Sequence, residues 1–187
     1  MQKNVHKVLT GLSFIIPFII YILTMAPTTS FWDCGEFIAT SYIMGVPHPP
    51  GSPLYLLLGN EFSSIPTFQD IGARVNLISP IASAFSVMFL YLIIVQLIQR
   101  LLLDNKNGNK IRIAEISAFI AAITFGVTDS HWFNAVEAEV YSISTFFTSF
   151  VVLVHISIKS YDLIVALTQG GPGISTTFPS LFMTQTA

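Results

Sequence analysis

Cysteine is nearly absent from this chain of 187 residues, in which Cys34 is the only one. A single thiol excludes an intrachain disulfide framework and a zinc site built from several cysteines. Charge is also scarce: charged residues make up 10% of the sequence, against about 25% in a typical soluble domain. An ordinary soluble domain is therefore not expected. The formal net charge of −2 offers no basic surface, so no nucleic-acid partner is expected either.

Apolar residues take the place of the missing charge, at 52% of the sequence and a mean hydropathy of +0.70. They gather in long runs close to the roughly 20 residues that cross a bilayer as a helix. We therefore predict an all-α integral membrane protein with about four transmembrane helices, at 8–26, 75–103, 113–128 and 138–158. The first run is longer than the apolar core of a signal peptide, so we expect it to be retained as a span.

The positive charges predict the orientation of these spans. No lysine or arginine occurs in 8–73, whereas four of them crowd 100–112 and Lys159 follows the fourth run. By the positive-inside rule, the N-terminus and the connection between the second and third spans are cytoplasmic. The loops 27–73 and 128–139 then face the other side, and the first of them is a long structured outer loop.

The first outer loop carries the densest group of reactive side chains, in the stretch FWDCGEFIATSYIMGVPHPPGSPLYLLLGN. Asp33 and Glu36 are three residues apart, so a helix beginning at Cys34 would place both carboxyls on one face as an acid/base pair. The alternative is a capping box, in which both side chains satisfy orphan amides at the helix start. His48 precedes two prolines, which hold its imidazole on a stiff turn.

Two short helices are expected within this loop, at 35–44 and 52–63, on either side of the proline turn. On the first of them, Phe37, Ile38 and Tyr42 are expected at the membrane interface, where aromatic side chains are enriched. A connection of this length with its own helices is typical of a functional segment.

The second outer segment, TDSHWFNAVEAEVYS, adds His131, Trp132, Glu137 and Glu139. An interfacial belt formed by Trp132 and Tyr141 is the alternative to a functional role. Glu139 lies so close to the fourth span that an unpaired carboxylate there would cost several kcal/mol in lipid. We therefore expect Glu139 to face protein or a wet cavity.

Two separated motifs, D-x-G-E with HPPG-x-P-L and W-x-x-A-V-x-A-E-V-Y, carry a resemblance to a known family. In order and spacing they resemble the amino-terminal part of the bacterial DUF2723 membrane proteins and the related TMEM260 family, placed among glycosyltransferases of the GT-C fold. The resemblance covers about residues 7–150. It implies a multi-pass protein of the bacterial inner (plasma) membrane that transfers a sugar from a polyprenyl-phosphate donor to a protein or glycan acceptor outside the cytoplasm.

The resemblance also implies roles for residues. In GT-C enzymes an acidic residue of the first outer loop acts as a base or faces a metal ion, which implies Asp33, with Glu36 beside it, as catalytic. No metal ligand is assigned, and a divalent metal ion is left open as the only cofactor. The departing phosphate needs cationic or amide stabilisation, for which His48 and Arg74 are the candidates. The other residues assigned to substrate binding are His131, Trp132, Glu137 and Glu139.

The last part of the chain departs from this family. Residues 161–187, YDLIVALTQGGPGISTTFPSLFMTQTA, resemble a short stretch of binding-protein-dependent sugar permeases. We therefore divide the chain into a membrane region, 1–159, and a permease-like or unrelated tail, 160–187, which we expect to pack poorly against the rest.

Two alternatives to a glycosyltransferase fragment follow from this division: a permease-like subunit of a sugar ABC transporter, and a non-catalytic membrane fragment or chimeric reading frame. The short basic connection 104–112 disfavours the transporter subunit, which needs an ATPase-facing loop. Because the later spans of the family are missing, we expect no sugar transfer by these 187 residues alone.

Overall fold

A computed structural model of the chain describes residues 2–101 and 108–168. The described residues form helices only, without a strand. In chain order these are α1 (Gln2–Thr24), α2 (Cys34–Ile43), α3 (Pro53–Ser64), α4 (Ile71–Asn76), α5 (Ile78–Leu101), α6 (Gly108–Gly126), α7 (Asp129–Ala135) and α8 (Val140–Thr168).

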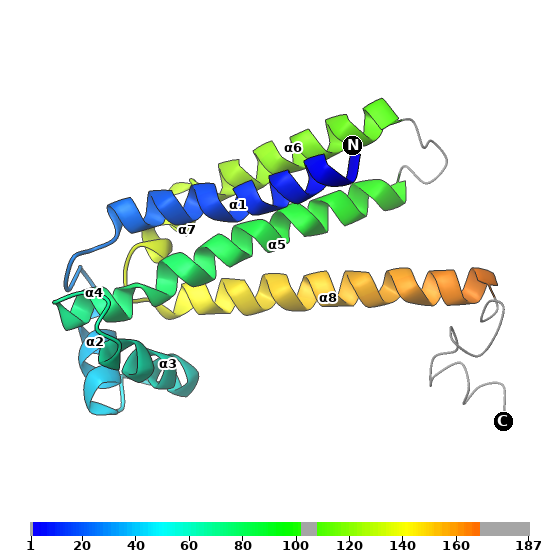
Figure 1. The fold of residues 1–187 in the computed structure, drawn as a ribbon. Helices are drawn as coiled ribbons and strands as arrows, with labels where there is room; N and C mark the ends of the chain where they lie inside the picture. Colours follow the sequence, from blue (N-terminus) through cyan, green and yellow to red (C-terminus); the bar gives the residue numbers. More distant parts are fainter. Residues whose placement is uncertain (1, 102–107, 169–187) are drawn as a thin grey trace, which may run out of the picture.

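The long helices α1, α5, α6 and α8 run side by side, and the short helices α2, α3 and α4 gather at one end of them (Figure 1). This end is called the α2–α4 end below. Three segments are long and apolar enough to cross a membrane, Asn4–Thr24, Ile71–Leu101 and Val140–Ile158, and α6 with α7 makes a fourth if the pair counts as one bent span. The expectation of an all-α membrane protein is confirmed.

Helix α5 is the centre of the bundle, in contact with α1, α6 and α8. Its first half buries a run of small side chains, among them Ser79, Ala82, Ser83 and Ser86. Small residues allow neighbouring helices to approach closely where lipid offers no hydrophobic drive for association. The sequence of α5 thus explains why it can accept a helix on several sides.

The third predicted span, 113–128, is broken near its end in the structure. Helix α6 ends at Gly126, and α7 begins at Asp129 in a direction that differs by 66°. Thr128 between them is extended, with φ −64° and ψ 145°, and the Tyr21 hydroxyl donates a hydrogen bond of 2.6 Å to the Gly126 carbonyl. A carbonyl freed at the end of α6 is thus satisfied from α1 rather than by continuing the helix.

The fourth predicted span, 138–158, begins two residues later than expected and continues further. Helix α8 starts at Val140 and runs to Thr168, because no glycine or proline interrupts the sequence before Gly170. The helix therefore crosses the proposed boundary at residue 160 without a break. The division itself stays a prediction, since the tail from residue 169 onward lies outside the described residues.

The two short helices expected in the first outer loop are present as α2 and α3, but their apolar side chains do not lie as expected. Phe37 and Ile38 are buried in the cluster between α2, α3 and α5, and only Tyr42 is exposed. The interfacial placement of Phe37 and Ile38 is wrong because α2 packs against α3 and α4. Pairing of the two helices removes this face from both water and lipid.

Asn76 anchors the α2–α4 end to the bundle. Its side chain is fully buried and donates hydrogen bonds of 2.8 Å to the carbonyls of Ala26 and Thr28. The thiol of Cys34, also fully buried, lies 3.6 Å from the Asn76 side-chain oxygen. Asn76 therefore connects the segment after α1 with the first residue of α2, and so fixes where the site below begins.

Candidate functional site

The imidazole of His48 lies between two carboxylates at the start of α2. Its Nδ1 is 2.7 Å from Glu36 Oε2, and its Nε2 is 4.0 Å from Asp33 Oδ2. The backbone N–H of His48 donates a second hydrogen bond, of 2.8 Å, to Glu36 Oε1. Both oxygens of Glu36 are thus used to hold one residue of the proline turn, which is twelve positions away in the sequence.

Asp33 remains open beside this pair. It stands at the N-cap position of α2, yet in the described part of the chain its side chain makes no capping hydrogen bond. Glu36 is likewise turned to His48 instead of back to the helix start. The capping-box alternative is therefore wrong, and the side chain of Asp33, 56% exposed, is available to a ligand.

Hydrogen bonding between Glu36 and His48 shifts the pKa of each. The bond from His48 lowers the pKa of the Glu36 carboxyl below its ordinary value. The bond to Glu36, and then its negative charge, raise the pKa of the His48 imidazole, and Asp33 adds to this effect. Opposite shifts of this kind favour a carboxylate next to an imidazolium. Protonation of His48 therefore places a positive charge 4.0 Å from Asp33 Oδ2.

A cavity of about 260 Å³ opens in front of these groups. Asp33 and His48 line one side of it, and Glu139, at the residue before α8, lines the other. Glu139 is 7% exposed, and burial, followed by the charges of Glu137 and Asp33, raises its pKa to about 7. The expectation that Glu139 faces a cavity is confirmed.

The connection between α7 and α8 is what brings Glu139 to this cavity. The Ala26 N–H donates a hydrogen bond of 2.8 Å to the Val136 carbonyl, which fixes the connection against the end of α1. Glu137, 2% exposed, lies on the same connection. Its charge and that of Glu139 add to burial in raising the pKa of the Cys34 thiol. Cys34 is therefore a structural residue with little thiolate character.

Asp33, Glu36 and His48 can each offer one ligand atom, and these three atoms lie within 4.8 Å of one another. Two carboxylate oxygens and one imidazole nitrogen form a donor set that suits several divalent cations. The same groups are also satisfied without an ion, because Glu36 and His48 bind each other directly. The arrangement fits a divalent metal but does not require one.

Four of the residues assigned to substrate binding do not line this cavity: Arg74, His131, Trp132 and Glu137. Arg74 donates hydrogen bonds to the carbonyls of Phe68, Ser63 and Gln69, at 2.6, 3.0 and 3.4 Å. Its guanidinium is therefore engaged by the loop between α3 and α4. A role of Arg74, His131, Trp132 and Glu137 in substrate binding stays a prediction.

The residues of α7 lie on another wall of the bundle. The His131 ring is 4.5 Å from that of Phe125, measured between centroids, and is buried. The Trp132 Nε1 donates to the Thr24 hydroxyl at 3.1 Å, which ties α7 to the end of α1. His131 therefore packs against α6, whereas Trp132 is bonded to the end of α1.

Several residues that line the cavity were not assigned from the sequence. The sequence predicts Phe37 at the membrane interface and offers Tyr141 as part of an aromatic belt, whereas the structure places both, together with Ser52, on the wall of this cavity. The Ser52 hydroxyl is buried and finds no hydrogen-bond partner within the described residues. The sequence signal for Ser52 as a residue of the site is its position directly after the HPPG turn, which carries His48.

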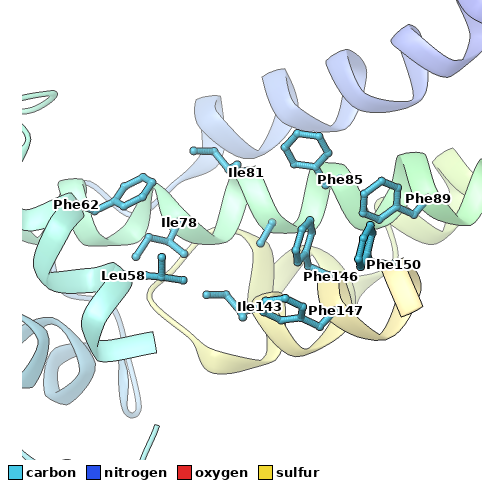
Figure 2. A pocket seen from close by; sticks show the side chains of 11 residues that line it. Leu58, Phe62, Ile78, Ile81, Phe85, Phe89, Ile143, Phe146, Phe147 and Phe150 are labelled. Atoms are coloured by element: carbon cyan, nitrogen blue, oxygen red, sulfur yellow. The ribbon is translucent and has the colours of Figure 1, made fainter. Parts of the chain in front are cut away.

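A second, apolar groove of about 310 Å³ lies between α3, α5 and α8. In Figure 2, Phe85 and Phe89 of α5 lie opposite Phe146 and Phe150 of α8, and Leu58 and Phe62 of α3 close one end. The groove is entirely apolar in its lining. Leu58, Phe62 and Phe146 also pack against the core cluster that contains Phe37, so this cluster borders both the groove and the carboxylate cavity, although no residue lines both.

The family match and the similar proteins indicate the same family. The family described as the Protein O-mannosyl-transferase TMEM260 N-terminal domain matches residues 33–165. A relative from Dictyostelium discoideum, "Protein O-mannosyl-transferase tmem260", is 28% identical over 140 residues, which are 74% of this chain and 15% of the relative. The mouse "Protein O-mannosyl-transferase TMEM260" is 27% identical over 128 residues, 68% of this chain and 16% of the relative.

No solved structure matches the chain significantly. The family match begins at Asp33 and includes both motifs as well as most of α8. The chain spans about a sixth or less of the length of the relatives it matches. The match nevertheless covers well over half of the present sequence, and the chain belongs to the TMEM260 N-terminal domain family.

Proposed function

We propose that this chain provides the acceptor-activating part of a membrane glycosyltransferase, which transfers mannose from a polyprenyl-phosphate donor to a hydroxyl group on the outer side. The observation that carries the proposal is the free Asp33 carboxylate beside the His48–Glu36 pair, in a cavity at one end of the helical bundle. The names of the relatives supply mannose as the sugar.

Asp33 is the base in this proposal. The acceptor hydroxyl loses its proton as it attacks the anomeric carbon, and a carboxylate within hydrogen-bond reach accepts that proton. Asp33 suits this role better than Glu36, because both oxygens of Glu36 are bound to His48. The carbon–oxygen bond to the lipid phosphate breaks in the same step, and the phosphate leaves as an anion.

His48 is the group that stabilises the leaving phosphate. Its pKa is raised by Glu36, so the imidazolium form extends to higher pH than in an isolated histidine. A preorganised cation close to the developing charge lowers the barrier most where water is excluded. Glu36 is then a positioning residue, which orients the imidazole and maintains its charge.

The phenylalanine-lined groove suits the polyprenyl chain of the donor. It lies against α5 and α8, both of which contain candidate spans, and the core cluster that includes Phe37 borders both the groove and the cavity. In this proposal the phosphate of a lipid in the groove extends toward His48, whose ring lies 6.2 Å from that of Phe37 between centroids. A water-soluble nucleotide sugar would leave the groove unused.

Replacing Asp33 by asparagine, in the full-length protein that carries this sequence, tests the proposal. The amide keeps the shape of the side chain but cannot accept the proton, so transfer of mannose should fall about 10²–10⁴-fold while donor binding persists. Asp70→Asn is the matched control. Asp70 accepts from the Ala73 N–H as the N-cap of α4, a role that asparagine fills equally well.

The measurement is transfer of radiolabelled mannose from a polyprenyl-phosphate donor to a serine- or threonine-containing peptide in membranes. Near-normal transfer by a folded Asp33→Asn variant would reject Asp33 as the base, whereas an absence of transfer by the wild-type protein would favour the alternative of a non-catalytic membrane protein. Equal losses in Asp33→Asn and Asp70→Asn would show that the assay reports folding of the loop instead of chemistry.

A further inference from the structure

The carboxylate cavity next to His48 contains two carboxyl groups in different surroundings. Asp33 lines one side of it with a side chain that is 56% exposed, whereas Glu139 lines the other side and is 7% exposed. Burial disfavours the ionised form of a carboxyl, and a second negative charge nearby disfavours it further. Two carboxyl groups whose environments differ in this way can divide the roles of base and acid between them. The proposed base Asp33 therefore faces a carboxyl that can keep its proton.

The carboxyl of Glu139 is open to an occupant of this cavity. Glu137 on the same connection has an oxygen, Oε1, that is enclosed and unpartnered within the described residues, whereas Glu139 has no such oxygen. The Val140 N–H offers a hydrogen bond to the carboxyl of Glu139. This N–H is itself a donor and cannot accept the proton of a neutral carboxyl. The O–H of protonated Glu139 is therefore available to an acceptor inside the cavity that this residue lines.

Hydrogen bonds to the backbone hold Glu139 in place. The Ser142 hydroxyl, buried in the first turn of α8, donates to the Glu139 carbonyl at 2.9 Å. The Ser79 hydroxyl of α5 lies 3.0 Å from the Ser142 hydroxyl and is also buried. The connection before Glu139 is bonded to the end of α1 through Ala26 and Val136. A donor on a fixed backbone stabilises charge without having to be reorganised during a reaction.

The groups around Glu139 set the pH at which it loses its proton. Burial first, and then the charges of Glu137 and Asp33, raise its pKa to about 7, against the opposite effect of His48. The other titratable side chains around it in the described part of the chain are Cys34, Tyr55 and Tyr141. Burial raises the pKa of the first two, so neither adds a negative charge near neutrality.

We propose that protonated Glu139 donates a hydrogen bond to the phosphate oxygen that leaves the anomeric carbon, as a second catalytic residue opposite Asp33. This assignment rests on the proposed function. In the transfer step the acceptor hydroxyl gives its proton to Asp33, and its oxygen bonds to the anomeric carbon. The bond from that carbon to the phosphate oxygen breaks, and the electron pair stays on this oxygen. Glu139 keeps its proton throughout and shares it with the oxygen in the hydrogen bond.

The leaving phosphate gains negative charge in this step, and a neutral O–H group is a suitable donor to it. Hydrogen bonds to an ionised oxygen are about twice as strong as those between neutral groups. Glu139 shares this task with His48, which lines the cavity on the side of Asp33. Ionisation of Glu139 removes the donor and adds a charge that repels the phosphate. The cavity is therefore active with Asp33 ionised and Glu139 neutral.

Two uncharged variants separate the hydrogen bond from the charge. Glu139→Gln keeps a donor in its side-chain amide, whereas Glu139→Ala has none. At slightly acidic pH, kcat for mannose transfer by the full-length protein should stay close to wild type in Glu139→Gln. In Glu139→Ala it should fall about 10²–10³-fold, the usual effect of removing one donor to a developing oxyanion. Thermal unfolding in detergent checks that both variants are folded.

The pH profile of kcat gives a second readout, which needs only the glutamine variant. Wild-type kcat should fall by about tenfold per pH unit once Glu139 ionises. Without donor the pKa of Glu139 is about 7, and the charge of the bound phosphate moves the fall to higher pH. Glu139→Gln should lose most of this fall and keep the smaller part that is due to His48.

Glu61→Gln is the matched control, because it makes the same chemical change on the exposed side of α3 and outside the cavity. Its kcat should follow the wild-type profile. A wild-type profile in Glu139→Gln, or equal kcat values in Glu139→Gln and Glu139→Ala, would overturn the proposal.

Affinity for the product polyprenyl phosphate tests the hydrogen bond without any transfer. In detergent at slightly acidic pH, Glu139→Ala should bind this product about 3- to 10-fold more weakly than Glu139→Gln, the loss of one hydrogen bond. Both side chains are uncharged, so repulsion does not contribute to the difference. Equal affinities would show that Glu139 donates no hydrogen bond to the phosphate.

Asp33→Asn separates this inference from the proposed function. If Asp33→Asn loses transfer while Glu139→Gln keeps the wild-type pH profile, the proposed function stands and the role of Glu139 is refuted. Near-normal transfer in Asp33→Asn, together with a profile that changes in Glu139→Gln, refutes Asp33 as the base and leaves Glu139 as the hydrogen-bond donor.

Discussion

At the scale of single residues, the pair of Glu36 and His48 decides what Asp33 can do. The spacing D-x-x-E favours a local capping box, yet Glu36 makes two bonds of 2.7 and 2.8 Å to a residue twelve positions away. A bond between a carboxylate and an imidazolium is stronger than one to a neutral amide, so the long-range partner prevails. Asp33 is left beside the helix start without a capping hydrogen bond in the described part of the chain, and its side chain interacts with His48 at 4.0 Å.

Glu139 leads to a prediction on pH. Its pKa of about 7 results from burial and from the charges of Glu137 and Asp33, so it loses its proton as the pH rises through neutrality. In the proposed arrangement the donor phosphate occupies the same cavity, and ionised Glu139 repels it. The KM for the lipid donor should therefore rise above about pH 7, by roughly tenfold if the repulsion amounts to about 1.4 kcal/mol.

Donor KM measured across neutral pH in Glu139→Gln checks this prediction. The glutamine stays neutral, so most of the rise should disappear. A smaller rise should remain, because His48 in the same cavity loses its positive charge as the pH increases through its raised pKa. Glu61→Gln, on the exposed side of α3, should keep the wild-type profile, and an unchanged profile in Glu139→Gln would contradict the role of Glu139.

At the scale of elements, local sequence signals located the helices, and the packing between them was less predictable. The proline turn and Pro53 at the first turn of α3 placed both short helices within one or two residues. The bend between α6 and α7 had no such signal, since Gly126 is stabilised there by Tyr21 from another helix. The burial of Phe37 likewise depends on a neighbouring helix, which the periodicity of α2 alone does not reveal.

Close approach between α2 and α3 depends on Gly59. A Cβ at this position would lie 2.6 Å from Ser41 Cβ and would also overlap the Ser41 hydroxyl. Gly59→Ala should therefore destabilise the protein by about 1–3 kcal/mol, the usual cost of overpacking, despite the better helix propensity of alanine. Thermal unfolding in detergent would measure this loss.

Gly11→Ala is the control, because a Cβ there meets nothing within 4 Å. That change should be neutral or stabilising by up to about 1 kcal/mol. Adding Ser41→Gly to Gly59→Ala moves the small residue to the opposite helix and should recover part of the lost stability. Equal stabilities of the Gly59→Ala and Gly11→Ala proteins would mean that α2 and α3 are not in close contact.

At the scale of the whole molecule, the polar carboxylate cavity and the apolar phenylalanine groove occupy different places on the bundle. The carboxylate cavity involves α2 and the residues just before α8, at the α2–α4 end, whereas the phenylalanine groove extends along α5 and α8 (Figure 1, Figure 2). A lipid-linked substrate has the same division, with a charged head and a long apolar chain. The architecture therefore suits a reaction at the surface of a membrane better than one in bulk water.

The positive charges predict the side of the membrane on which this reaction would occur, and this orientation leads to the last prediction. Cys34 is fully buried and its pKa is raised, so the wild-type chain should react little with a membrane-impermeant maleimide. Val46→Cys introduces a thiol at a residue 89% exposed in the first outer loop and should be labelled in intact cells. Asn109→Cys, exposed at the opposite end of the bundle, should be labelled only after the membrane is permeabilised.

Neither substitution changes a charge, so the positive-inside signal that sets the orientation is preserved in both variants. Labelling of Asn109→Cys but not of Val46→Cys in intact cells would invert the topology. Asp33 and His48 would then face the cytoplasm, and an acceptor on the outer side could not reach them. Because the proposed base and the labelled loop belong to the same segment, this experiment tests the location of the chemistry independently of whether transfer is observed.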